Sequence, residues 1–393
     1  MVNKMVLLIG SYAPDQWQSM LRFGQMMLDG LRACGVEARL ICPPAVFGRI
    51  RLFGATAAKW LGYIDKFILF RWQLWRSLAA RPTLVHICDH SNATYARAAA
   101  RFPVVITCHD LFAVRAAIGE NPDYTPSFTG RTLQYWILRG LRRADFIACI
   151  SSVTAEDVKR LVVRRAGRPR VAIVPLGLNY PYRKLSPTEA HQRLAQISQL
   201  DLTVPFVLHV GTNTPRKNRD GVLRIFARVK DRWDGRLIFA GERLNEELKT
   251  TARELNIADR IVEIENVGSE VLEALYSLAV AMLYPSRFEG FGWPVIEAHA
   301  CGCPVICSKA GPLSEVAGEA GLFHEIDDED GFARDLLRLS DVEEREHWSA
   351  KALRNAARFS AARMISQYCE IYRSVAPNDD WSAPKSARLS AAT

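Results

Sequence analysis

PSRFEGFGWPVIEAHACGCPVICSKAGPLSEVAG, residues 285–318, is the stretch that decides the fold. The apolar run VAMLYP (280–285) leads into it and is typical of a buried strand. The chain then passes through a Gly-Phe-Gly turn into a helix that we expect to begin near Trp293. A second apolar run, PVICS (304–308), follows that helix. Strand, glycine-rich turn, helix and strand in this order are typical of a parallel α/β sheet.

The same alternation extends over most of the 393 residues. Gly and Pro residues in LGLNYPYRKLSPT (176–188) interrupt it, so we expect a domain linker there. Two α/β domains are predicted, at 1–180 and 188–360, with a closing helix at 361–375 that packs back toward the first domain. The tail 376–393 is expected to be disordered. The other predicted strands are 5–9, 37–42, 84–88, 104–108, 145–150, 171–175, 205–211, 236–241 and 260–264.

Composition and charge narrow the class of protein. With 49% hydrophobic and 24% charged residues, the chain resembles an average soluble globular protein. No window approaches the roughly 18 uncharged apolar residues of a membrane-spanning helix. Nine scattered cysteines and a short N-terminal apolar run favour reduced thiols in a cytoplasm. Residues 1–200 carry 27 Lys and Arg against 12 Asp and Glu, so this half could face nucleic acid, an anionic membrane or an anionic substrate.

The Gly-Phe-Gly turn offers candidate binding groups. The backbone N–H groups of Gly290, Phe291 and Gly292 would lack helical acceptors at a helix start, which suits an anion. Glu289 lies in the turn and Glu297 about one turn inside the helix, and carboxylates beside a phosphate site suit sugar hydroxyls. Alternatively, Glu289 caps the helix and Glu297 is a solvated surface acid.

HVGTNTPRKNRDGVLRIF (209–226) again reads as a strand, a polar loop that follows Gly211, and a helix. Arg216 and Lys217 at the helix start oppose the helix dipole, which makes sense if an anion such as a phosphate completes the site. The alternative is a solvated basic loop.

In VVITCHDLF (104–112), His109 and Asp110 follow a strand at the edge where parallel sheets bind ligands. Acid–base chemistry, a sugar hydrogen bond and a purely structural role all fit. No metal site is expected, because His109 and Asp110 have no clear third ligand. The cysteines at 301, 303 and 307 read as packing thiols in an apolar helix–strand unit.

TCHD (107–110), GTNTPRKN (211–218) and EGFGWPVIEAHACGCPV (289–305), in that order, resemble glycosyltransferase family 4, the group 1 retaining glycosyltransferases. The resemblance covers nearly the whole chain. It implies a GT-B fold, in which two Rossmann-like parallel-sheet domains face each other across a cleft that holds a nucleotide-sugar. By resemblance, the first domain binds the acceptor and the second binds the donor.

The resemblance also implies roles for single residues. Arg216 and Lys217 match the pair that holds the donor diphosphate. Glu289 matches the residue that contacts the donor sugar, and Glu297 the residue that binds the ribose. His109 matches the histidine near the transferred sugar. The implied catalytic residues are therefore His109, Arg216, Lys217 and Glu289.

The implied substrate-binding residues include the first loop, where this chain departs from the family. Many members carry a Gly-Gly pair there, whereas this chain reads GSYAPDQWQSMLRFG (10–24). Gly10 and Ser11 are the nearest equivalents, and residues 16–19 could substitute. The full expected set is Gly10, Ser11, Asp110, Gly211, Gly290, Phe291, Gly292 and Glu297.

The resemblance implies transfer with retention of anomeric configuration, without a metal or other cofactor, by a front-face mechanism in which the leaving phosphate acts as base. A mannose-type donor on GDP is favoured, and UDP-glucose-type donors stay open. We therefore expect a hexosyltransferase that acts on a glycolipid or oligosaccharide acceptor in surface-glycan synthesis. The alternatives are another GT-B enzyme, such as a nucleotide-sugar epimerase or a glycogen-type synthase, and a non-catalytic basic scaffold. No specific nucleic-acid partner is expected, because no base-reading motif is present.

Residues 47–76 contain six basic residues, one acid and eight aromatics. Basic and aromatic side chains together suit a membrane interface, which predicts peripheral contact with the inner face of the plasma membrane. The alternative is an amphipathic helix pair whose aromatics fill the core of the first domain.

Overall fold

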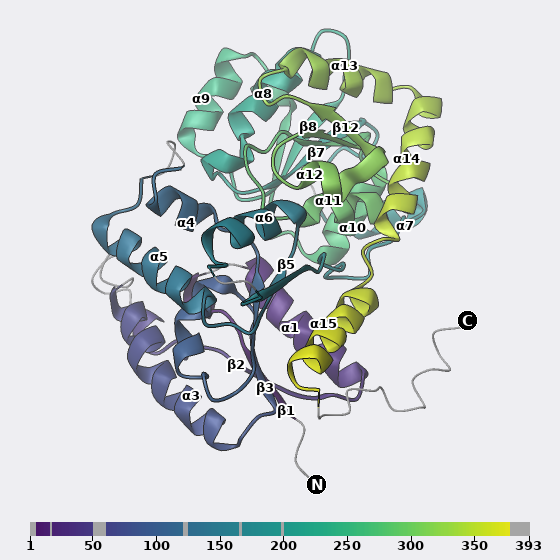
Figure 1. Ribbon diagram of the computed structural model, residues 1–393. Coiled ribbons are helices and arrows are strands. Elements are labelled where there is room, and N and C mark those ends of the chain that lie inside the picture. Colours follow the sequence, from purple (N-terminus) through teal and green to yellow (C-terminus); the bar gives the residue numbers. More distant parts are fainter. Residues whose placement is uncertain are drawn as a thin grey trace. The chain divides into compact units, whose positions relative to one another are not determined.

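The computed structural model describes residues 5–15, 18–49, 60–120, 125–164, 167–197 and 200–377, which divide into two structural units (Figure 1). Unit 1 takes the described residues up to Asn179 and those from Ala361 onward. Unit 2 runs from Tyr180 to Ser360. Positions 378–393 of the expected disordered tail lie outside the described residues, as do 16–17 of the first loop and 50–59 of the aromatic stretch.

Unit 1 is built on one parallel sheet with the strand order β2-β1-β3-β4-β5-β6. β3, β4 and β5 are buried along their whole length, because helices cover both faces of the sheet. The strands are β1 (Met5–Ile9), β2 (Glu37–Ile41), β3 (Leu84–Ile87), β4 (Val104–Cys108), β5 (Phe146–Cys149) and β6 (Arg170–Ile173). The helices are α1 (Gln18–Ala33), η3 (Asp65–Leu69), α3 (Phe70–Ala79), η4 (His90–Arg97), α4 (Phe112–Ala117), α5 (Phe128–Leu141), α6 (Ser152–Leu161) and α15 (Ala361–Val375).

Alternate residues of β3 and β4 face different helices, as a strand requires. Val85 and Ile106 join one hydrophobic core with residues of α3, η4 and α5. On the other face, His86 and Thr107 hydrogen-bond the tyrosines of α15: His86 Nδ1 lies 2.7 Å from the Tyr372 hydroxyl. The last helix of the chain is thereby fixed to the sheet of unit 1.

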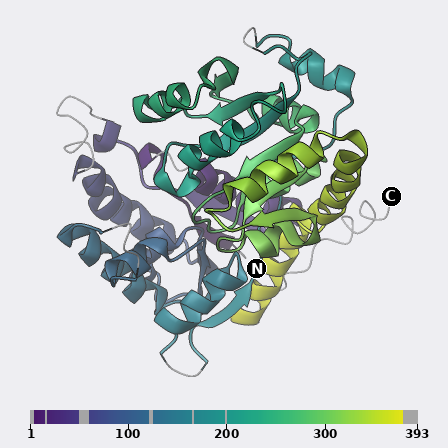
Figure 2. The same ribbon diagram turned by 90° about the horizontal axis from the view of Figure 1, so that it is seen from above.

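Unit 2 has a second parallel sheet, in the order β12-β11-β10-β7-β8-β9 (Figure 2 gives the view from above). Its strands are β7 (Phe206–Gly211), β8 (Arg236–Gly241), β9 (Ile261–Glu265), β10 (Ala281–Tyr284), β11 (Val305–Ser308) and β12 (Gly321–His324). Its helices include α7 (Pro187–Leu194), η5 (Pro215–Lys217), α8 (Arg219–Ala227), α9 (Glu246–Glu254), α10 (Ser269–Leu278), α11 (Trp293–Ala300), α12 (Leu313–Ala317), α13 (Glu329–Leu339) and α14 (Val342–Ala356).

The predicted pair of parallel α/β sheets is confirmed. Each predicted strand is present within two residues of its expected bounds, and β12 was not predicted. The segment expected as a linker, 176–188, is packed: Tyr182 and Leu185 are buried, and the Leu185 N–H donates to Ser277 Oγ of α10 at 3.1 Å. Among the described residues, no helix is long and apolar enough to cross a bilayer.

Each sheet has one point at which the strand order reverses. In unit 2 the chain builds outward from β7 through β8 and β9, and then returns to place β10 on the other side of β7. In unit 1 the reversal lies between β1 and β3. Open parallel sheets bind ligands beyond the carboxyl ends of the strands at such a point. The loops that follow β7 and β10, and those that follow β1 and β3, are therefore where a site is expected.

Candidate active site

The loops after β7 and β10 bring two cations and one carboxylate together in unit 2. Lys217 Nζ lies 2.6 Å from Glu289 Oε1, and Arg216 Nη1 lies 3.0 Å from Glu289 Oε2. The hydroxyl of Tyr284, the last residue of β10, donates to Glu289 Oε1 at 2.9 Å. Lys217, Tyr284 and Glu289 are buried, whereas 43% of the Arg216 side chain is exposed. The solvated-loop alternative is therefore wrong for Lys217.

Backbone contacts fix the two loops against each other. The N–H of Arg287 donates to the carbonyl of Arg216 at 2.7 Å. Asn218 adopts a left-handed conformation, with φ 52° and ψ 45°, and its Nδ2 donates to the carbonyl of Pro285 at 3.0 Å. Asn is among the few residues that adopt this conformation readily, so a single position both turns the chain into α8 and binds the second loop.

The charges in the cluster are mutually stabilised. Burial alone would raise the pKa of Glu289, but Lys217 and Arg216 outweigh it and hold that pKa below its usual range. Burial lowers the pKa of Lys217, and the Glu289 carboxylate opposes that change. Glu289 is therefore an anion at neutral pH, and it holds the two cations at the reversal point of the sheet.

The Gly-Phe-Gly turn leads directly into α11. Gly292 is the residue before the helix, with φ 106°, and no side chain caps the helix start. The oxygens of Glu289 are directed to Lys217, Arg216 and Tyr284, so the capping alternative for Glu289 is wrong. Phe291 is buried, and its ring packs edge-on against Phe359 at 5.8 Å between centroids. Gly290 lies partly exposed between Glu289 and Phe291.

Glu297 lies one turn inside α11 and is only 4% exposed, so the solvated-acid alternative is wrong. Its Oε2 accepts from the Tyr276 hydroxyl at 3.3 Å. Burial lowers the pKa of Lys217, and the charge of Glu297 opposes that change together with Glu289. The two predicted glutamates of the EGFGWPVIE motif are thus both buried acceptors that interact with Lys217.

Gly211 ends β7 beside the cluster. A side chain there would place Cβ 3.3 Å from Cδ of Lys217, and Gly241 at the end of β8 approaches the Gly211 carbonyl even more closely. That carbonyl accepts from Arg219 Nη2 at 2.6 Å. Arg219 is almost fully buried and was not predicted, because in sequence it reads as an ordinary helix-surface arginine. Gly211 thus allows the close approach of Lys217, and no ligand contact is needed to explain it.

In unit 1, His109 follows β4 and is buried. Its Nε2 lies 2.9 Å from the carbonyl of Cys88, and a carbonyl only accepts, so Nε2 carries the proton. Nδ1 is then an acceptor, and no described residue donates to it. Burial lowers the pKa of His109, and Asp89 opposes that change, so the ring is neutral at neutral pH. The edge of the His109 ring packs against Phe23 at 4.9 Å between centroids.

Gly10 and Ser11 lie at the reversal point of this sheet. Ser11 Oγ donates to Asp89 Oδ2 at 3.0 Å, which connects the loop after β1 to the loop after β3. Asn92 Nδ2 donates to the Gly10 carbonyl at 3.2 Å. Asp89 is a second residue that the prediction missed, and its signal was an acid directly after a buried strand. The Asp110 carboxylate accepts from the Phe112 N–H at 3.0 Å, at the start of α4, and its expected contact with substrate stays a prediction.

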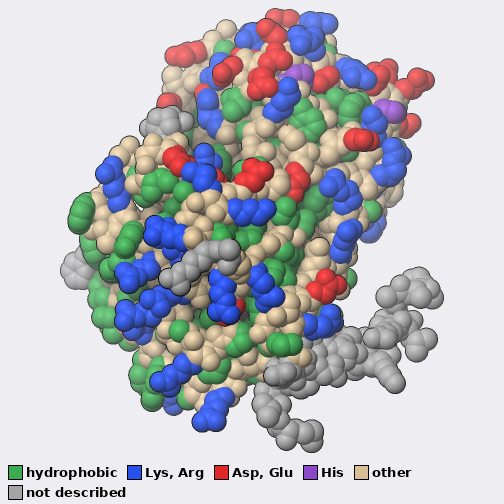
Figure 3. All heavy atoms as spheres, viewed as in Figure 1, with side chains coloured by type: hydrophobic (Ala, Val, Ile, Leu, Met, Phe, Trp, Pro, Cys, Tyr) green, Lys and Arg blue, Asp and Glu red, His purple; other side chains and the backbone are tan. Residues whose placement is uncertain are grey.

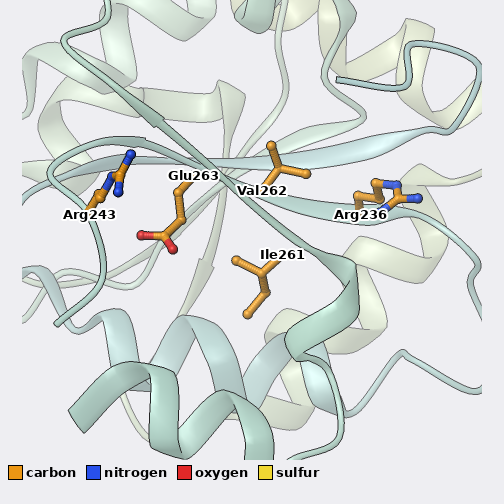
Figure 4. Close-up of a pocket in the computed structure, with 5 residues that line it drawn as sticks. All are labelled: Arg236, Arg243, Ile261, Val262 and Glu263. Atoms are coloured by element: carbon orange, nitrogen blue, oxygen red, sulfur yellow. The ribbon is translucent and has the colours of Figure 1, made fainter. Parts of the chain in front are cut away.

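A separate hollow of about 340 Å³ lies on β8 and β9 of unit 2 (Figure 4). Arg243 and Glu263 lie at one end of it and Arg236 at the other. None of the predicted site residues lines it. We therefore do not assign this hollow to the candidate active site.

The chain is similar to known proteins over most of its length. Residues 25–180 match the family described as Glycosyltransferase Family 4, and residues 191–355 match Glycosyl transferases group 1. O-antigen chain mannosyltransferase B of Escherichia coli is 30% identical over 275 residues, which span 68% of this chain and 70% of that enzyme. D-inositol 3-phosphate glycosyltransferase of Acidothermus cellulolyticus is 28% identical over 290 residues, spanning 69% of this chain and 62% of that enzyme.

Solved structures share the fold at low sequence identity. Sucrose-phosphate synthase of Thermosynechococcus elongatus superposes with a TM-score of 0.75 at 19% identity, over 96% of this chain and all of the other. Anabaena HepE in complex with UDP-glucose gives 0.71 at 15% identity, over 94% of this chain and 99% of the other.

Proposed function

This chain belongs to the group 1 glycosyltransferases, and we propose that it transfers a hexose, mannose in the first instance, from a nucleotide-sugar to a lipid-linked or polysaccharide acceptor. Its fold is the two-domain α/β GT-B fold. Because the chain is an enzyme of this family, the non-catalytic scaffold is excluded. We propose the stereochemistry of the reaction, the donor, the acceptor and the location of the enzyme.

One observation carries the proposal: the buried pair of Lys217 and Glu289, together with the part-exposed Arg216, forms a charged cluster at the reversal point of the unit 2 sheet, beside the start of α11. Lys217 has three N–H bonds, and two are directed to Tyr284 and Glu289. Departure of a nucleoside diphosphate adds negative charge to its β-phosphate. Fixed cations and the positive end of a helix stabilise that charge without reorganisation.

The carboxylates supply the acceptors that sugars require. Glu289 is ionised and is the proposed acceptor for hydroxyls of the donor sugar, and Glu297 is the proposed acceptor for the ribose hydroxyls. In unit 1, Nδ1 of His109 is proposed to accept from a hydroxyl of the transferred sugar. We assign no covalent nucleophile, and we propose retention by a front-face mechanism in which the leaving phosphate takes the acceptor proton. The cations take the place of a metal ion.

The donor and acceptor classes rest on relatives. The mannosyltransferase similarity supports GDP-mannose, whereas the HepE complex supports a UDP-sugar and the inositol-phosphate enzymes support a phosphorylated polyol acceptor. The basic character of residues 1–200 favours an anionic acceptor, such as a lipid diphosphate. With such an acceptor, we expect the enzyme to act at the cytoplasmic face of the plasma membrane.

The first test is a thermal-shift panel of GDP-mannose, UDP-glucose, GDP and UDP on the intact protein and on Glu297→Gln. A ligand at 100 times its Kd stabilises the folded protein by about 2.7 kcal/mol. We expect a shift with one nucleotide class, weakened in the variant. No shift with any of the four contradicts the donor assignment.

The second test uses the donor that the panel selects. The anomeric configuration of the product, read by NMR, is expected to equal that of the donor sugar, and activity is expected to persist in EDTA. Inversion, or loss of activity that Mg²⁺ or Mn²⁺ restores, contradicts the proposed mechanism.

A further inference from the structure

Two helical segments of unit 1 have outer faces that are both aromatic and basic. In residues 60–79, which comprise the helical residues 60–64, η3 and α3, Trp72 is 61% and Trp75 is 68% exposed. In α5, Phe128 is 84% exposed. Large apolar side chains gathered in this way mark an interaction site rather than an ordinary surface. The exposed apolar residues of the two segments are Trp60, Ile68, Trp72, Trp75, Phe128, Tyr135 and Trp136.

The exposure is one-sided. Ile68, Trp72 and Trp75 follow the spacing of a single helix face, while Phe70 and Leu74 point into the core. In α5, likewise, Ile137, Leu138 and Leu141 are buried in the same core. The alternative expected from the sequence, in which the aromatics fill the core, therefore holds for Phe70 and fails for the tryptophans.

Both segments lie on the same side of unit 1. The ring of Phe70 in α3 packs on Tyr95 of η4 at 4.7 Å between centroids. Gly140 of α5 lies so close to η4 that a side chain there would strike the carbonyl of Ala93. η4 thus separates the two segments, and Figures 1 and 2 both show α3 and α5 on one side of the unit.

The exposed charge on the two segments themselves is of one sign. Arg71 and Arg76 of α3 and Arg131 and Arg139 of α5 are exposed, and the Arg76 guanidinium stacks 4.6 Å over the ring of Trp72. Residues 60–79 hold a single acid, Asp65, which is fully buried, and α5 holds none. Figure 3 shows hydrophobic and basic side chains interspersed over the lower left of the view, where α3 and α5 lie in Figure 1.

We propose that this aromatic–basic surface, formed by the exposed side chains of residues 60–79 and α5, docks unit 1 on an anionic lipid bilayer. Tryptophan and tyrosine partition to the headgroup level, and arginine pairs with lipid phosphates while its stem lies along apolar atoms. The lack of exposed acid on both segments complements a negative surface.

The same surface is connected to the candidate acceptor edge. Asp65 accepts from the Tyr12 hydroxyl at 2.5 Å and from the Gly48 N–H at 2.9 Å. Lys66 Nζ lies 2.6 Å from Asp15. Tyr12 and Asp15 belong to the loop after β1, next to Ser11. Docking therefore places the carboxyl edge of the unit 1 sheet at the lipid headgroups. The use of this edge for an acceptor rests on the proposed function, whereas docking itself does not.

The test is flotation of the full chain with vesicles of phosphatidylcholine alone and with about one third phosphatidylglycerol. We expect strong binding to the anionic vesicles only. Each basic residue at such a surface contributes about a fivefold change in affinity, so Arg131→Glu/Arg139→Glu is expected to weaken binding at least tenfold. Trp72→Ala/Trp75→Ala is expected to lower the bound fraction by a similar factor. Val342→Ala/Leu353→Ala and Arg334→Glu, which alter exposed residues of unit 2, are the matched controls and are expected to bind as the unchanged chain does.

Equal binding by all variants, or no preference for anionic vesicles, overturns the proposal. So does a dimer that Trp72→Ala/Trp75→Ala converts to monomer in light scattering while vesicles stay unbound. Each variant is also assayed for transfer to a water-soluble acceptor, which docking does not require. A variant that loses vesicle binding but keeps transfer to the soluble acceptor supports docking. If the unchanged chain shows no transfer activity at all, that result contradicts the proposed function but not the docking proposal.

Discussion

Lys217 and Glu289 form a buried ion pair, with Nζ 2.6 Å from Oε1, across 72 positions of sequence. The pair joins the loop after β7 to the loop after β10, the two strands between which the order of the sheet reverses. A buried pair of this kind adds little stability over apolar residues, but a single remaining charge is costly. Its presence at the reversal point therefore points to the ligand rather than to the fold.

Removal of one partner should show this cost. Glu289→Ala leaves the Lys217 ammonium buried, and we expect the free energy of unfolding to fall by about 3–5 kcal/mol. Lys217→Met/Glu289→Gln removes both charges and is expected to be less destabilised than Glu289→Ala, although equally inactive. Urea denaturation of the three proteins measures the difference. A double variant at least as unstable as the single one would show that the pair does support the fold.

Arg216 is the member of the cluster whose loss separates catalysis from folding. Its side chain is 43% exposed, and Glu289 keeps Lys217 as a partner when it is removed. We expect Arg216→Ala to retain its melting temperature and to lose about 10²–10³ in kcat, the usual effect of one fixed transition-state donor. Arg253→Ala on α9 is the control for loss of an exposed arginine. A change in KM alone would reduce Arg216 to a ground-state binding residue.

Much of this arrangement could be predicted, because buried parallel strands and glycine-rich turns leave a local signature. The eleven predicted strands, and the return of the chain to a second sheet, follow from apolar runs of the right length. β12 (GLFH) was missed, since only Leu322 and Phe323 in it are large and apolar, which does not distinguish it from a loop. The boundary between the two units, after Asn179, lies within the predicted linker 176–188, but the contacts of that segment with α10 could not be predicted.

Site residues could be predicted only where they belong to a recognisable sequence motif. Arg216, Lys217 and Glu289 were found as separate stretches, but whether Lys217 is solvated depends on a loop 67 or more positions away. In sequence, Asp89 reads only as an acid after a buried strand and Arg219 as a base on a helix surface, and neither pattern indicates that the side chain is buried. Their burial arises from the fold itself, which no single stretch of sequence encodes.

The glycine before α11 should tolerate no side chain. Gly292→Ala forces a residue with Cβ into φ 106° and places that Cβ 2.7 Å from Cδ2 of Leu313. We expect a loss of about 1–3 kcal/mol in the free energy of unfolding and of most transferase activity, because the start of α11 moves. Gly119→Ala is the control, because Gly119 has φ 85° and nothing lies within 4 Å of the added Cβ. Its effect measures the cost of the backbone conformation without a steric clash. Equal effects on activity from the two variants would contradict a role for the α11 start.

Stability should fall in mild acid because of three buried histidines. Burial lowers the pKa of His86, His209 and His299 to about 3, whereas in the unfolded chain they titrate near 6.5. Between these values the unfolded chain binds more protons, so stability is lost as the pH falls below about 6.5. Each histidine contributes a loss of about 2 kcal/mol between pH 7 and pH 5. Denaturation midpoints measured at several pH values should decline less steeply for His299→Gln, and replacement of the exposed His347 is the control.

Asp89 should govern the acceptor side alone. Its buried carboxylate accepts from Ser11 Oγ at 3.0 Å and from the Ser91 N–H at 2.9 Å, so it holds the loops after β1 and β3 together. Ser11→Ala removes one of these bonds and is expected to cost about 1 kcal/mol. Asp89→Asn places an amide donor against other donors and is expected to cost more. Because both residues belong to unit 1, KM for the acceptor should rise, while the thermal shift produced by the nucleotide-sugar should match that of the unchanged chain. A nucleotide-sugar shift that weakens in Ser11→Ala would instead assign the first loop to the donor.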